Sequence, residues 1–489
     1  MDFRLRLSHD SEVPLYRQVY EQLAHWIHTG ELARGERLPA TRELAGLLGL
    51  NRTTISTAYE LLEADGLIAG QVGRGSFVTG PDPIVPATDD RRVNWDGILP
   101  PASALGGFAS TEISFVMSRP SRDLFPLDDF RESCASVLRR DDLADILQLG
   151  SPSGYEPLRR LLLEDARRQQ LARSGDDLLI TNGCQQALDL IGRVLLRPGD
   201  TVALEDPVYP GLKNLLAGMG AQLAGIPVGP DGVDLAVLER VLRDRPRFLV
   251  VTSNFQNPTG ATLPLAGRRA LLDAGRAAGV PVVENDAYGD LRYSGEPLPA
   301  LKQLDESGGT ILLRSFSKIS FPGLRVGWAL GPKALVDRLR HAKEAADLHT
   351  DHLSQAVLLE FAESGRLEAH RRRVLEAGGA RLAATLDGCR EFLPAGTRFT
   401  RPEGGMNVWL RLPEPLDAAA LLPRARKEGV AYLPGHYFTV SRSEPGALRL
   451  SFASLPPDQI RSGLAVLGRL VAAELERAAD TVEPVSALV

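Results

Sequence analysis

The first eighty residues alternate between helical spacing of apolar positions and short, glycine-bounded apolar runs. A first helix is predicted between Pro14 and Gly30, where Leu15, Val19, Leu23 and Ile27 recur at helical spacing. A second helix is predicted over Thr41–Leu48, with Thr41 as its N-cap, and a third from an Asn51 cap to about Asp65. Two apolar runs around glycines between 66 and 78 predict a β-hairpin. Three helices and a hairpin are the elements of a winged helix, which we assign to residues 1–79.

The pattern then changes twice. Residues 80–112 are rich in proline, have no sustained period, and are interpreted as a linker that could span about 30 Å as a flexible coil. From 113 to 480, strand-like runs alternate with amphipathic helices, which predicts a mostly parallel sheet with helices on both faces. The predicted strands of this sheet are Asp177–Thr181, Thr201–Leu204, Arg247–Thr252, Val280–Glu284 and Thr310–Leu313. A smaller α+β subdomain is expected over about 377–480, with strands at Met406–Leu412 and Ala447–Phe452.

Composition narrows the possible classes of protein. The chain has 489 residues, is 44% hydrophobic, and can therefore bury at least one large core. Its formal net charge of -6 argues against nucleic-acid binding by bulk electrostatics, so any DNA contact must come from a local surface. Three scattered cysteines form no metal-binding pattern, and no run of about 18 apolar residues occurs. We expect a soluble cytoplasmic protein without a structural metal or a membrane partner.

The predicted third helix has the two faces of a DNA-recognition helix. Its buried stripe is expected to be Ile55, Ala58, Leu61 and Leu62. The other face would present Arg52, Thr53, Thr54, Ser56 and Thr57 to base edges, while Arg42 and Arg74 would contact phosphates or the minor groove. The alternative is that these polar residues are only the solvated face of a small bundle. The stretches PLYRQV, GERLPATRELAGLLGLNRTTIS and GRGSFV resemble the GntR-type winged helix, which implies binding to double-stranded DNA.

The stretch LRSFSKISFPGLRVGWALGP surrounds Lys318 with small and apolar residues. Such surroundings favour a neutral amine, which a lysine needs if it is to capture an aldehyde. Ser315, Ser317 and Arg325 lie close by in sequence and suit a phosphate tail. The stretch resembles the lysine loop of fold-type I aminotransferases. That resemblance implies that Lys318 forms a Schiff base with pyridoxal 5'-phosphate.

Further motifs of that family follow in chain order, and their joint order carries more weight than any one of them. TNGCQQALDL resembles the turn that cradles the cofactor phosphate, and EDPVYPG, NPTG and ENDAYGDL resemble motifs that contact the ring. ALRLSF resembles the strand whose arginine grips the substrate carboxylate. The residues implied by these matches are Gly183, Cys184 and Gln185 for the phosphate, Tyr209 for stacking, Asn257 and Tyr288 for the ring hydroxyl, and Arg449 for the carboxylate.

The sequence departs from the family pattern at two positions. Relatives carry an acid three residues before the ring-contacting tyrosine, where this chain has Asn285. The neighbouring Asp286 should point to the opposite side of the strand unless the backbone bulges, so either residue remains a candidate for the ring nitrogen. If Asn285 holds that place, deprotonation at Cα should be slow, while exchange with amino compounds remains possible. The second departure is Leu149, where relatives have a tyrosine that contacts phosphate across the dimer.

A winged helix joined to an aminotransferase-like domain resembles the MocR subfamily of GntR regulators. The resemblance implies a regulator whose large domain senses pyridoxal phosphate, a small amino compound or both, and which forms a head-to-tail homodimer. The alternative is a working aminotransferase that carries an accessory DNA-binding module, so we leave open whether the domain is catalytic. A third interpretation is a dimerisation platform without chemistry, against which the intact Lys318 motif argues.

Overall fold

The computed structural model describes residues 5, 7–8, 13–71, 75–79 and 111–481. The chain divides into two compact units, Met1–Gly107 and Phe108–Val489. Almost all of the predicted linker lies outside the described residues, as does Arg74.

The smaller unit contains the three helices and the hairpin that the sequence predicts. Its elements are α1 (Leu15–His28), α2 (Thr41–Leu48), α3 (Arg52–Ala64), β1 (Ile68–Gln71) and β2 (Gly75–Val78). The two strands pair antiparallel, with Ile68 opposite Val78. The core joins all three helices through buried side chains that include Leu23, Leu44 and Ile55. The fold is therefore a winged helix.

Two details of this unit differ from the prediction. Thr41 is the first residue of α2 rather than its cap; Ala40 holds the cap position, where no side chain bonds the helix end. Leu61 is only partly buried, and Tyr59 takes its place in the core, with its hydroxyl donating to the Pro39 carbonyl at 2.9 Å. A tyrosine can lie in the core here because its hydroxyl has a main-chain acceptor.

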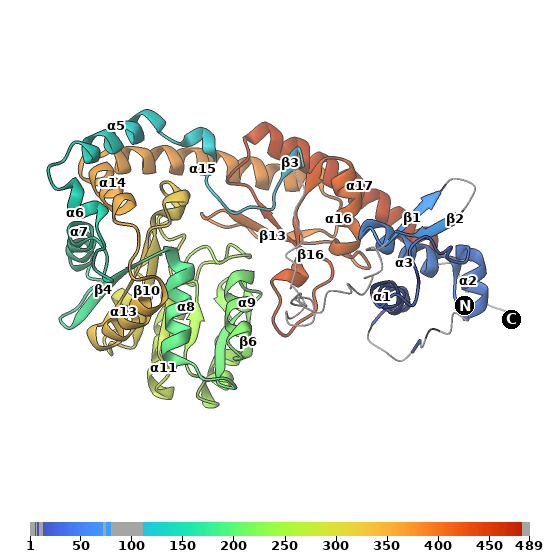
Figure 1. Cartoon of the computed structure of the whole chain (residues 1–489), viewed down its shortest axis with the longest axis horizontal. Helices are drawn as coiled ribbons and strands as arrows, with labels where there is room; N and C mark the ends of the chain where they lie inside the picture. Colours follow the sequence, from blue (N-terminus) through green and yellow to red (C-terminus); the bar gives the residue numbers. More distant parts are fainter. Residues whose placement is uncertain (1–4, 6, 9–12, 72–74, 80–110, 482–489) are drawn as a thin grey trace, which may run out of the picture. The chain divides into compact units, whose positions relative to one another are not determined.

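An eight-stranded mixed sheet forms the centre of the larger unit (Figure 1). In spatial order its strands are β4 (Asp176–Thr181), β11 (Gly327–Pro332), β10 (Thr310–Ser315), β9 (Val282–Asn285), β8 (Leu249–Val251), β5 (Thr201–Asp206), β6 (Gln222–Gly229) and β7 (Gly232–Val233). All five predicted strands are present, whereas β6, β7 and β11 were not predicted. The β11 sequence contains two glycines and a proline, and it becomes a strand because β4 and β10 both pair with it antiparallel.

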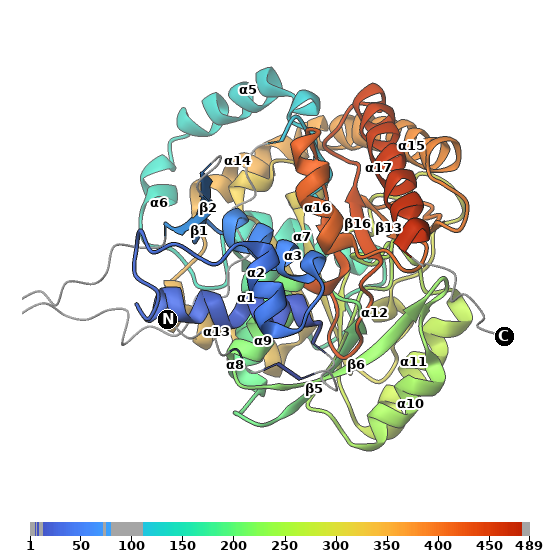
Figure 2. The same cartoon turned by 90° about the vertical axis from the view of Figure 1, so that its right-hand side faces the viewer.

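Helices cover both faces of this sheet, as the strand–helix alternation predicted. The helices of the larger unit before its long helix are α5 (Leu127–Leu138), α6 (Leu143–Leu147), α7 (Glu156–Arg168), α8 (Gly183–Leu195), α9 (Pro210–Gly218), α10 (Leu235–Arg243), α11 (Leu265–Ala278), α12 (Leu301–Leu304), α13 (Lys333–Asp347) and α14 (His352–Glu363). Figure 2 shows α8 and α9 on one side of β5 and β6, and α10 and α11 on the other. Along β9, Val283 packs into the core with α8 and α13, while Val282 packs with α10 and α11.

A second lobe of the larger unit carries a four-stranded sheet. Its elements are α15 (Arg366–Phe392), β12 (Arg398–Phe399), β13 (Asn407–Arg411), α16 (Ala418–Lys427), β14 (Val430–Ala431), β15 (Leu433–Pro434), β16 (Ala447–Ser451) and α17 (Pro457–Thr481). Figure 1 shows α15 running between the two lobes, and its buried residues Val374 and Leu382 belong to different cores. The lobe also includes β3 (Ile113–Ser114), which pairs with β14. Residues that begin the larger unit therefore help to build its last lobe.

Candidate cofactor site and DNA-reading surface

Loops after several parallel strands bring the predicted site residues together at one edge of the large sheet. Lys318 ends a short 3-10 helix, Phe316–Lys318, that follows β10 directly. Its Nζ donates to the Ser118 carbonyl at 2.7 Å and lies 5.3 Å from the centre of the Tyr288 ring. Burial alone would raise the pKa of the Tyr288 phenol. The charge of Lys318, the hydrogen bond with Ser118 and the charge of Arg449 outweigh burial, so the pKa lies below its usual value.

The turn between β4 and α8 forms an anion-binding cradle beside the lysine loop. Gly183 begins α8 with φ +76, and a Cβ there would lie 2.6 Å from Nη2 of Arg325. The same Nη2 donates to the Asn182 carbonyl at 3.2 Å, and Nη1 reaches the Ser317 hydroxyl at 3.5 Å. The N-terminus of a 13-residue helix, a guanidinium and a hydroxyl thus meet at one point. This is the chemistry that a phosphate group requires.

Cys184 and Gln185 continue this first turn of α8. Burial raises the pKa of the Cys184 thiol to about 11, so the side chain is a neutral thiol at physiological pH. Ser315 supports the adjoining loop by accepting a bond from the Ser317 main-chain N–H at 3.3 Å. Gln185 Nε2 donates to the Gly211 carbonyl at 3.1 Å, which ties the cradle to α9. Tyr209 caps that helix and is partly exposed.

Arg449 is a buried cation at the other side of the site. It lies on β16 and is 4% exposed. Nη1 donates to Oδ1 of Asn257 at 3.0 Å, Nη2 donates to the Val116 carbonyl, and Nε is buried without a partner. Burial lowers the pKa of Arg449 to about 10. None of the described carboxylates pairs with this guanidinium, so it retains an unsatisfied preference for an anion.

Asn257 connects the two halves of the site. Its Oδ1 accepts from Arg449, and its Nδ2 donates to the Tyr288 hydroxyl at 3.3 Å. The same hydroxyl lies 3.3 Å from the hydroxyl of Ser118. Lys318, Tyr288, Asn257 and Arg449 therefore form one chain of contacts, as the motif order predicted they would lie together.

Asn285 and Asp286 lie on opposite sides of β9. The Asp286 carboxylate accepts two bonds from Arg314, at 2.9 and 2.7 Å, and one from Asn254 at 2.9 Å. Asn285 continues the face of Val283, which is the α8 side of the sheet, because strand side chains alternate. Its Oδ1 is buried and has no hydrogen-bond partner among the described residues. The acid is thus held by structural partners, while the amide has spare hydrogen-bonding capacity.

Two groups of site residues had no signal in the sequence motifs. The first is Val116 and Ser118, which contribute main-chain carbonyls that no residue pattern identifies. The second is Asp347, at the end of α13, whose carboxylate accepts from Asn182 at 2.7 Å, from Gln186 at 2.6 Å and from Lys343 at 2.6 Å. Asp347 thereby fixes the residue before Gly183, so it positions the anion cradle from a helix 165 residues away in sequence.

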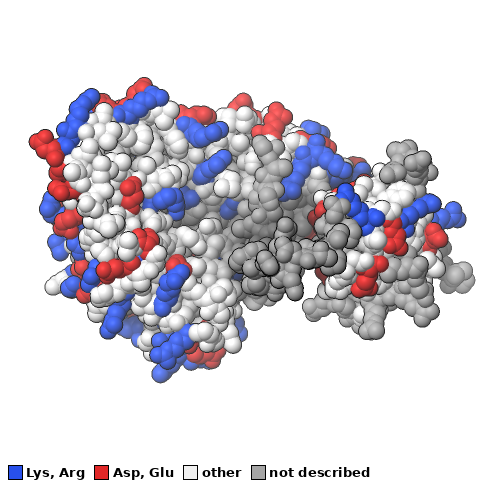
Figure 3. All heavy atoms as spheres, viewed as in Figure 1, with Lys and Arg blue, Asp and Glu red and all other residues white. Residues whose placement is uncertain are grey.

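The winged helix presents its predicted reading surface at the start of α3. Asn51 caps this helix, its Oδ1 accepting from the Thr53 main-chain N–H at 3.2 Å. Arg52, Thr53 and Thr57 are exposed, and Thr54 and Ser56 are partly exposed; Arg42 is exposed on α2. Figure 3 shows Lys and Arg interleaved with Asp and Glu over the visible face of the larger unit. Charge therefore does not single out that face of the larger unit for DNA.

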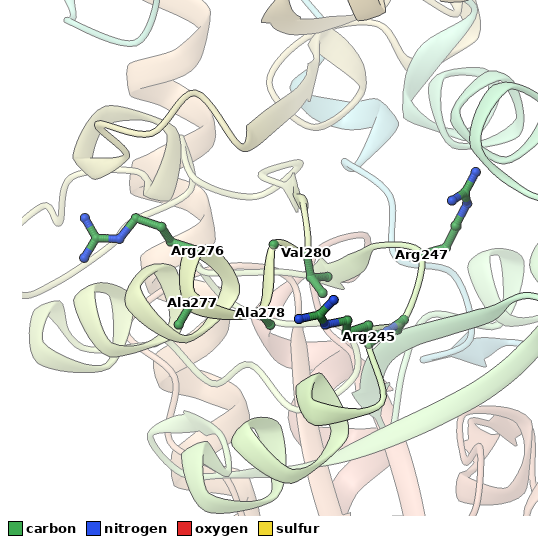
Figure 4. Close-up of a pocket in the computed structure, with 8 residues that line it drawn as sticks. Arg245, Arg247, Arg276, Ala277, Ala278 and Val280 are labelled. Atoms are coloured by element: carbon green, nitrogen blue, oxygen red, sulfur yellow. The ribbon is translucent and has the colours of Figure 1, made fainter.

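A pocket of about 410 Å³ lies away from these residues, at the opposite edge of the sheet. Arg245, Arg247 and Arg276 line it, and Figure 4 shows Arg247 and Arg276 pointing to opposite sides. Arg247 pairs with Asp200, and Arg276 pairs with Asp273. These arginines follow or end helices, where cations complement the helix dipole. The pocket therefore has no convergent anion site.

The described residues also bear on metals and membranes. They contain no group of three or more His, Cys, Asp or Glu side chains arranged to hold a metal ion. Within the same part of the chain, every helix is too short or too polar to cross a membrane.

The fold and site define a winged helix joined to a fold-type I pyridoxal-phosphate unit. Residues 127–467 match the family model "Aminotransferase class I and II", and residues 15–78 match "Bacterial regulatory proteins, gntR family". The chain belongs to the aminotransferase class I and II family, within the group of GntR-type regulators that includes MocR. Pyridoxal 5'-phosphate is the cofactor of this fold, and the Gly183 cradle with Arg325 fits its phosphate.

Three similar proteins illustrate the two parts of this membership. The probable rhizopine catabolism regulatory protein MocR of Rhizobium meliloti is 30% identical over 94% of this chain and 94% of its own length. The 2-aminoadipate transaminase of Thermus thermophilus is 42% identical over 73% of this chain and 89% of its own length. The crystal structure of LysN, the α-aminoadipate aminotransferase of the same species, complexed with N-(5'-phosphopyridoxyl)-L-leucine, matches with a TM-score of 0.70 and 39% identity over 75% of this chain and 93% of its own.

Proposed function

We propose that this chain is a pyridoxal-phosphate-dependent transcriptional regulator whose larger unit senses the cofactor, an amino compound or both. The observation that carries this proposal is the extent of the alignments: regulators align along both modules, whereas the aminotransferases align along the larger unit alone. A protein whose only task is transamination has no use for a DNA-reading helix.

In this proposal the small unit binds a promoter through the start of α3. Arg52, Thr53, Thr54, Ser56 and Thr57 meet base edges in the major groove, and Arg42 contacts phosphate. Arg74 is assigned a phosphate or minor-groove contact from its place in the hairpin sequence. The capping bond of Asn51 supports this assignment, because it holds the first turn of α3 in a defined position.

The larger unit holds the cofactor between the anion cradle and the lysine loop. Bound pyridoxal phosphate supplies an aldehyde that can exchange between amines and a ring that accepts electrons. We assign Lys318 to the covalent link with the cofactor, and Arg325, Ser315, Ser317 and the first turn of α8 (Gly183, Cys184 and Gln185) to the phosphate. Tyr209 is assigned to ring stacking, and Asn257 and Tyr288 to the ring hydroxyl. The 3.3 Å contact between Asn257 and Tyr288 supports a shared acceptor for those two donors.

Arg449 defines the chemical class of the effector. A buried guanidinium without a carboxylate partner favours an anionic ligand, and its geometry suits two-pronged binding of a carboxylate. The amine of the effector would be exchanged at the Lys318 position. We therefore propose an amino acid, or another amine that carries a carboxylate, as the effector.

The second candidate function is a working aminotransferase with an accessory DNA module, which the complete Lys318 site favours. Asn285 argues for sensing instead. We assign the ring nitrogen to Asn285, because the Asp286 carboxylate is engaged by Arg314 and Asn254. A neutral amide can hydrogen-bond a pyridine nitrogen but cannot hold it protonated, so removal of the Cα proton should be slow. Residual transamination remains compatible with this assignment.

We further propose a head-to-tail homodimer located in the cytoplasm. Aminotransferase-like domains of this family usually dimerise. Exposed apolar side chains on the larger unit, such as Leu147 and Leu149, support an interface with a second copy. A cytoplasmic location follows from binding to chromosomal DNA and to this cofactor.

The proposal is tested by measuring the affinity of the full-length protein for the DNA upstream of its own coding region. The measurement is made with and without pyridoxal phosphate, then with each of the protein amino acids, at one fixed salt concentration. We expect the cofactor, or one of these amines in its presence, to change the affinity about tenfold in the wild type and to leave Lys318→Ala unaffected. An affinity that no combination changes would overturn the sensing role. Stoichiometric 2-oxo acid in the same samples would favour the aminotransferase.

A further inference from the structure

Three consecutive residues hold three of the site residues at once. Val116, Met117 and Ser118, here named the carbonyl segment, cross the site between Lys318 and Arg449. The Ser118 carbonyl accepts from Lys318 at 2.7 Å, the Val116 carbonyl accepts from Arg449, and the Ser118 hydroxyl lies 3.3 Å from that of Tyr288. The charged atoms that we assign to the cofactor and the effector are therefore both bonded to one short stretch of main chain.

The carbonyl segment is attached firmly on its N-terminal side. The Ile113 and Phe115 amides donate to the Gly429 and Ala431 carbonyls at 2.9 and 2.8 Å, and Phe115 is fully buried. On the other side, the Arg119 amide donates to the Met117 carbonyl at 3.0 Å, which makes a tight turn, and the Met117 side chain is 51% exposed. A change in the segment is thus transmitted to β3 rather than absorbed by a loose loop.

The Val116 carbonyl is a weak partner for a cation that is so deeply buried. A neutral carbonyl offers less electrostatic stabilisation than a carboxylate, which forms charge-assisted bonds roughly twice as strong. Both two-pronged geometries of a guanidinium with a carboxylate use Nη2, the atom that Val116 engages. Nε, the other donor of one of these geometries, has no partner. A ligand carboxylate and the Val116 carbonyl consequently compete for one atom.

We propose that the carbonyl segment is the element that reports effector binding. The effector carboxylate takes Nη2 of Arg449 from the Val116 carbonyl, and the released segment shifts β3, which begins at Ile113. The chain continues N-terminally from β3 through the linker to the winged helix, so the effector site and the DNA reader share this covalent path. This proposal rests on the function proposed above, and it specifies how the same site is regulated.

The test uses the full-length protein and two probes that differ only in the carboxylate. The first probe is N-(5'-phosphopyridoxyl)-L-leucine, and the second is the matching phosphopyridoxyl amine without the carboxylate. A fluorophore is placed on Met117→Cys in a Cys134→Ser background, because Cys184 is enclosed and Cys389 is buried. The same fluorophore on exposed Leu138→Cys is the position control. Binding of each probe is measured separately by calorimetry on the unlabelled protein.

We expect the carboxylated probe to bind about 10- to 100-fold more tightly and to change the emission of the Met117→Cys label, with no change at Leu138→Cys. At saturation, the amine probe should leave both labels unchanged. Equal responses of the Met117→Cys label to both saturating probes, or no response to either, would overturn the role of the carbonyl segment while leaving the proposed function intact. Failure of both probes to bind would instead overturn the proposed function.

Discussion

At the scale of single residues, the site differs from a standard aminotransferase at the place assigned to the ring nitrogen. Asn285 has a buried amide oxygen without a partner, and Asp286 is tied to Arg314 on the other side of the strand. A carboxylate at position 285 would meet the cofactor from the α8 side of the sheet, where Arg325 and Lys318 also lie. One side chain thus separates the two candidate functions.

The first prediction is that Asn285→Asp increases transamination. An ionised aspartate beside the ring nitrogen raises the pKa of that nitrogen and stabilises charge that develops as the Cα proton leaves. We expect 2-oxo acid formation in single-turnover experiments to rise on the order of 100-fold, together with a change in the pH dependence of the absorbance of the bound cofactor. Asp286→Asn is the matched swap, and it should leave that absorbance as in the wild type. An unchanged rate and spectrum in Asn285→Asp would contradict the assignment.

At the scale of elements, the ends of strands and helices hold the charged groups whose environments matter most. Glu205, near the end of β5, is 3% exposed, and burial raises its pKa to about 8. It accepts from the Thr252 main-chain N–H at 3.0 Å and from Gln256 at 3.3 Å, and no described cation pairs with it. This strand therefore contains an acid that folding keeps protonated.

The second prediction concerns the pH dependence of stability. Because the folded pKa of Glu205 exceeds its unfolded value, its contribution is fully present below about pH 4.5 and is lost as pH rises through about 8. Between pH 6 and pH 8 this group alone lowers the free energy of unfolding by about 2 kcal/mol. Glu205→Gln should lose correspondingly less stability over that interval, as measured by urea denaturation of the larger unit. Parallel losses in wild type and variant would show that Glu205 is not the responsible group.

The third prediction concerns α3 as a recognition helix. Arg52→Ala should weaken binding to the cognate DNA by about 10- to 100-fold, and it should reduce discrimination between the cognate site and one changed at the contacted base. Arg17→Ala, on α1, removes an exposed arginine paired with Glu21 and should leave the affinity nearly unchanged. Anisotropy titrations at several salt concentrations separate a base contact from a phosphate contact. Equal losses for cognate and altered sites would assign Arg52 to the backbone.

At the scale of the whole molecule, the larger unit exposes large apolar side chains on and beside α6. Leu147 is 63% exposed and Leu149 is 72% exposed, although Ile146 between them and the core is buried. Leaving such side chains in water has no benefit for a monomer. A second copy of the chain is the partner that the fold offers, and Leu149 stands where relatives contribute to the site across the dimer.

The fourth prediction is that charges at this surface dissociate the homodimer. Leu147→Glu combined with Leu149→Glu should convert a dimer to a monomer in sedimentation experiments, because two buried carboxylates cannot be desolvated without partners. Ala236→Glu, at an exposed position on α10, adds a carboxylate elsewhere and should remain dimeric. A double variant that still sediments as a dimer would place the interface elsewhere.

Much of this protein could be predicted from local sequence patterns. The period of apolar residues determined the three helices of the small unit and five strands of the sheet, since each pattern matches the repeat of one secondary structure. The motifs around Lys318, Gly183, Asn257 and Arg449 follow from residue chemistry, and the structure brings these residues to one edge of the sheet. Strand β11 was missed, because its glycines and proline become a strand only through pairing with two neighbours.

The sequence by itself determined the fold class, the two modules and most of the candidate site, because these depend on periodicity and on residue types. Only the tertiary structure decided which of Asn285 and Asp286 is held by structural partners, because that depends on Arg314 and Asn254, which lie on other elements. It alone identified the carbonyl segment, because main-chain carbonyls have the same chemistry at every position and acquire a role only when the fold brings them beside Lys318 and Arg449.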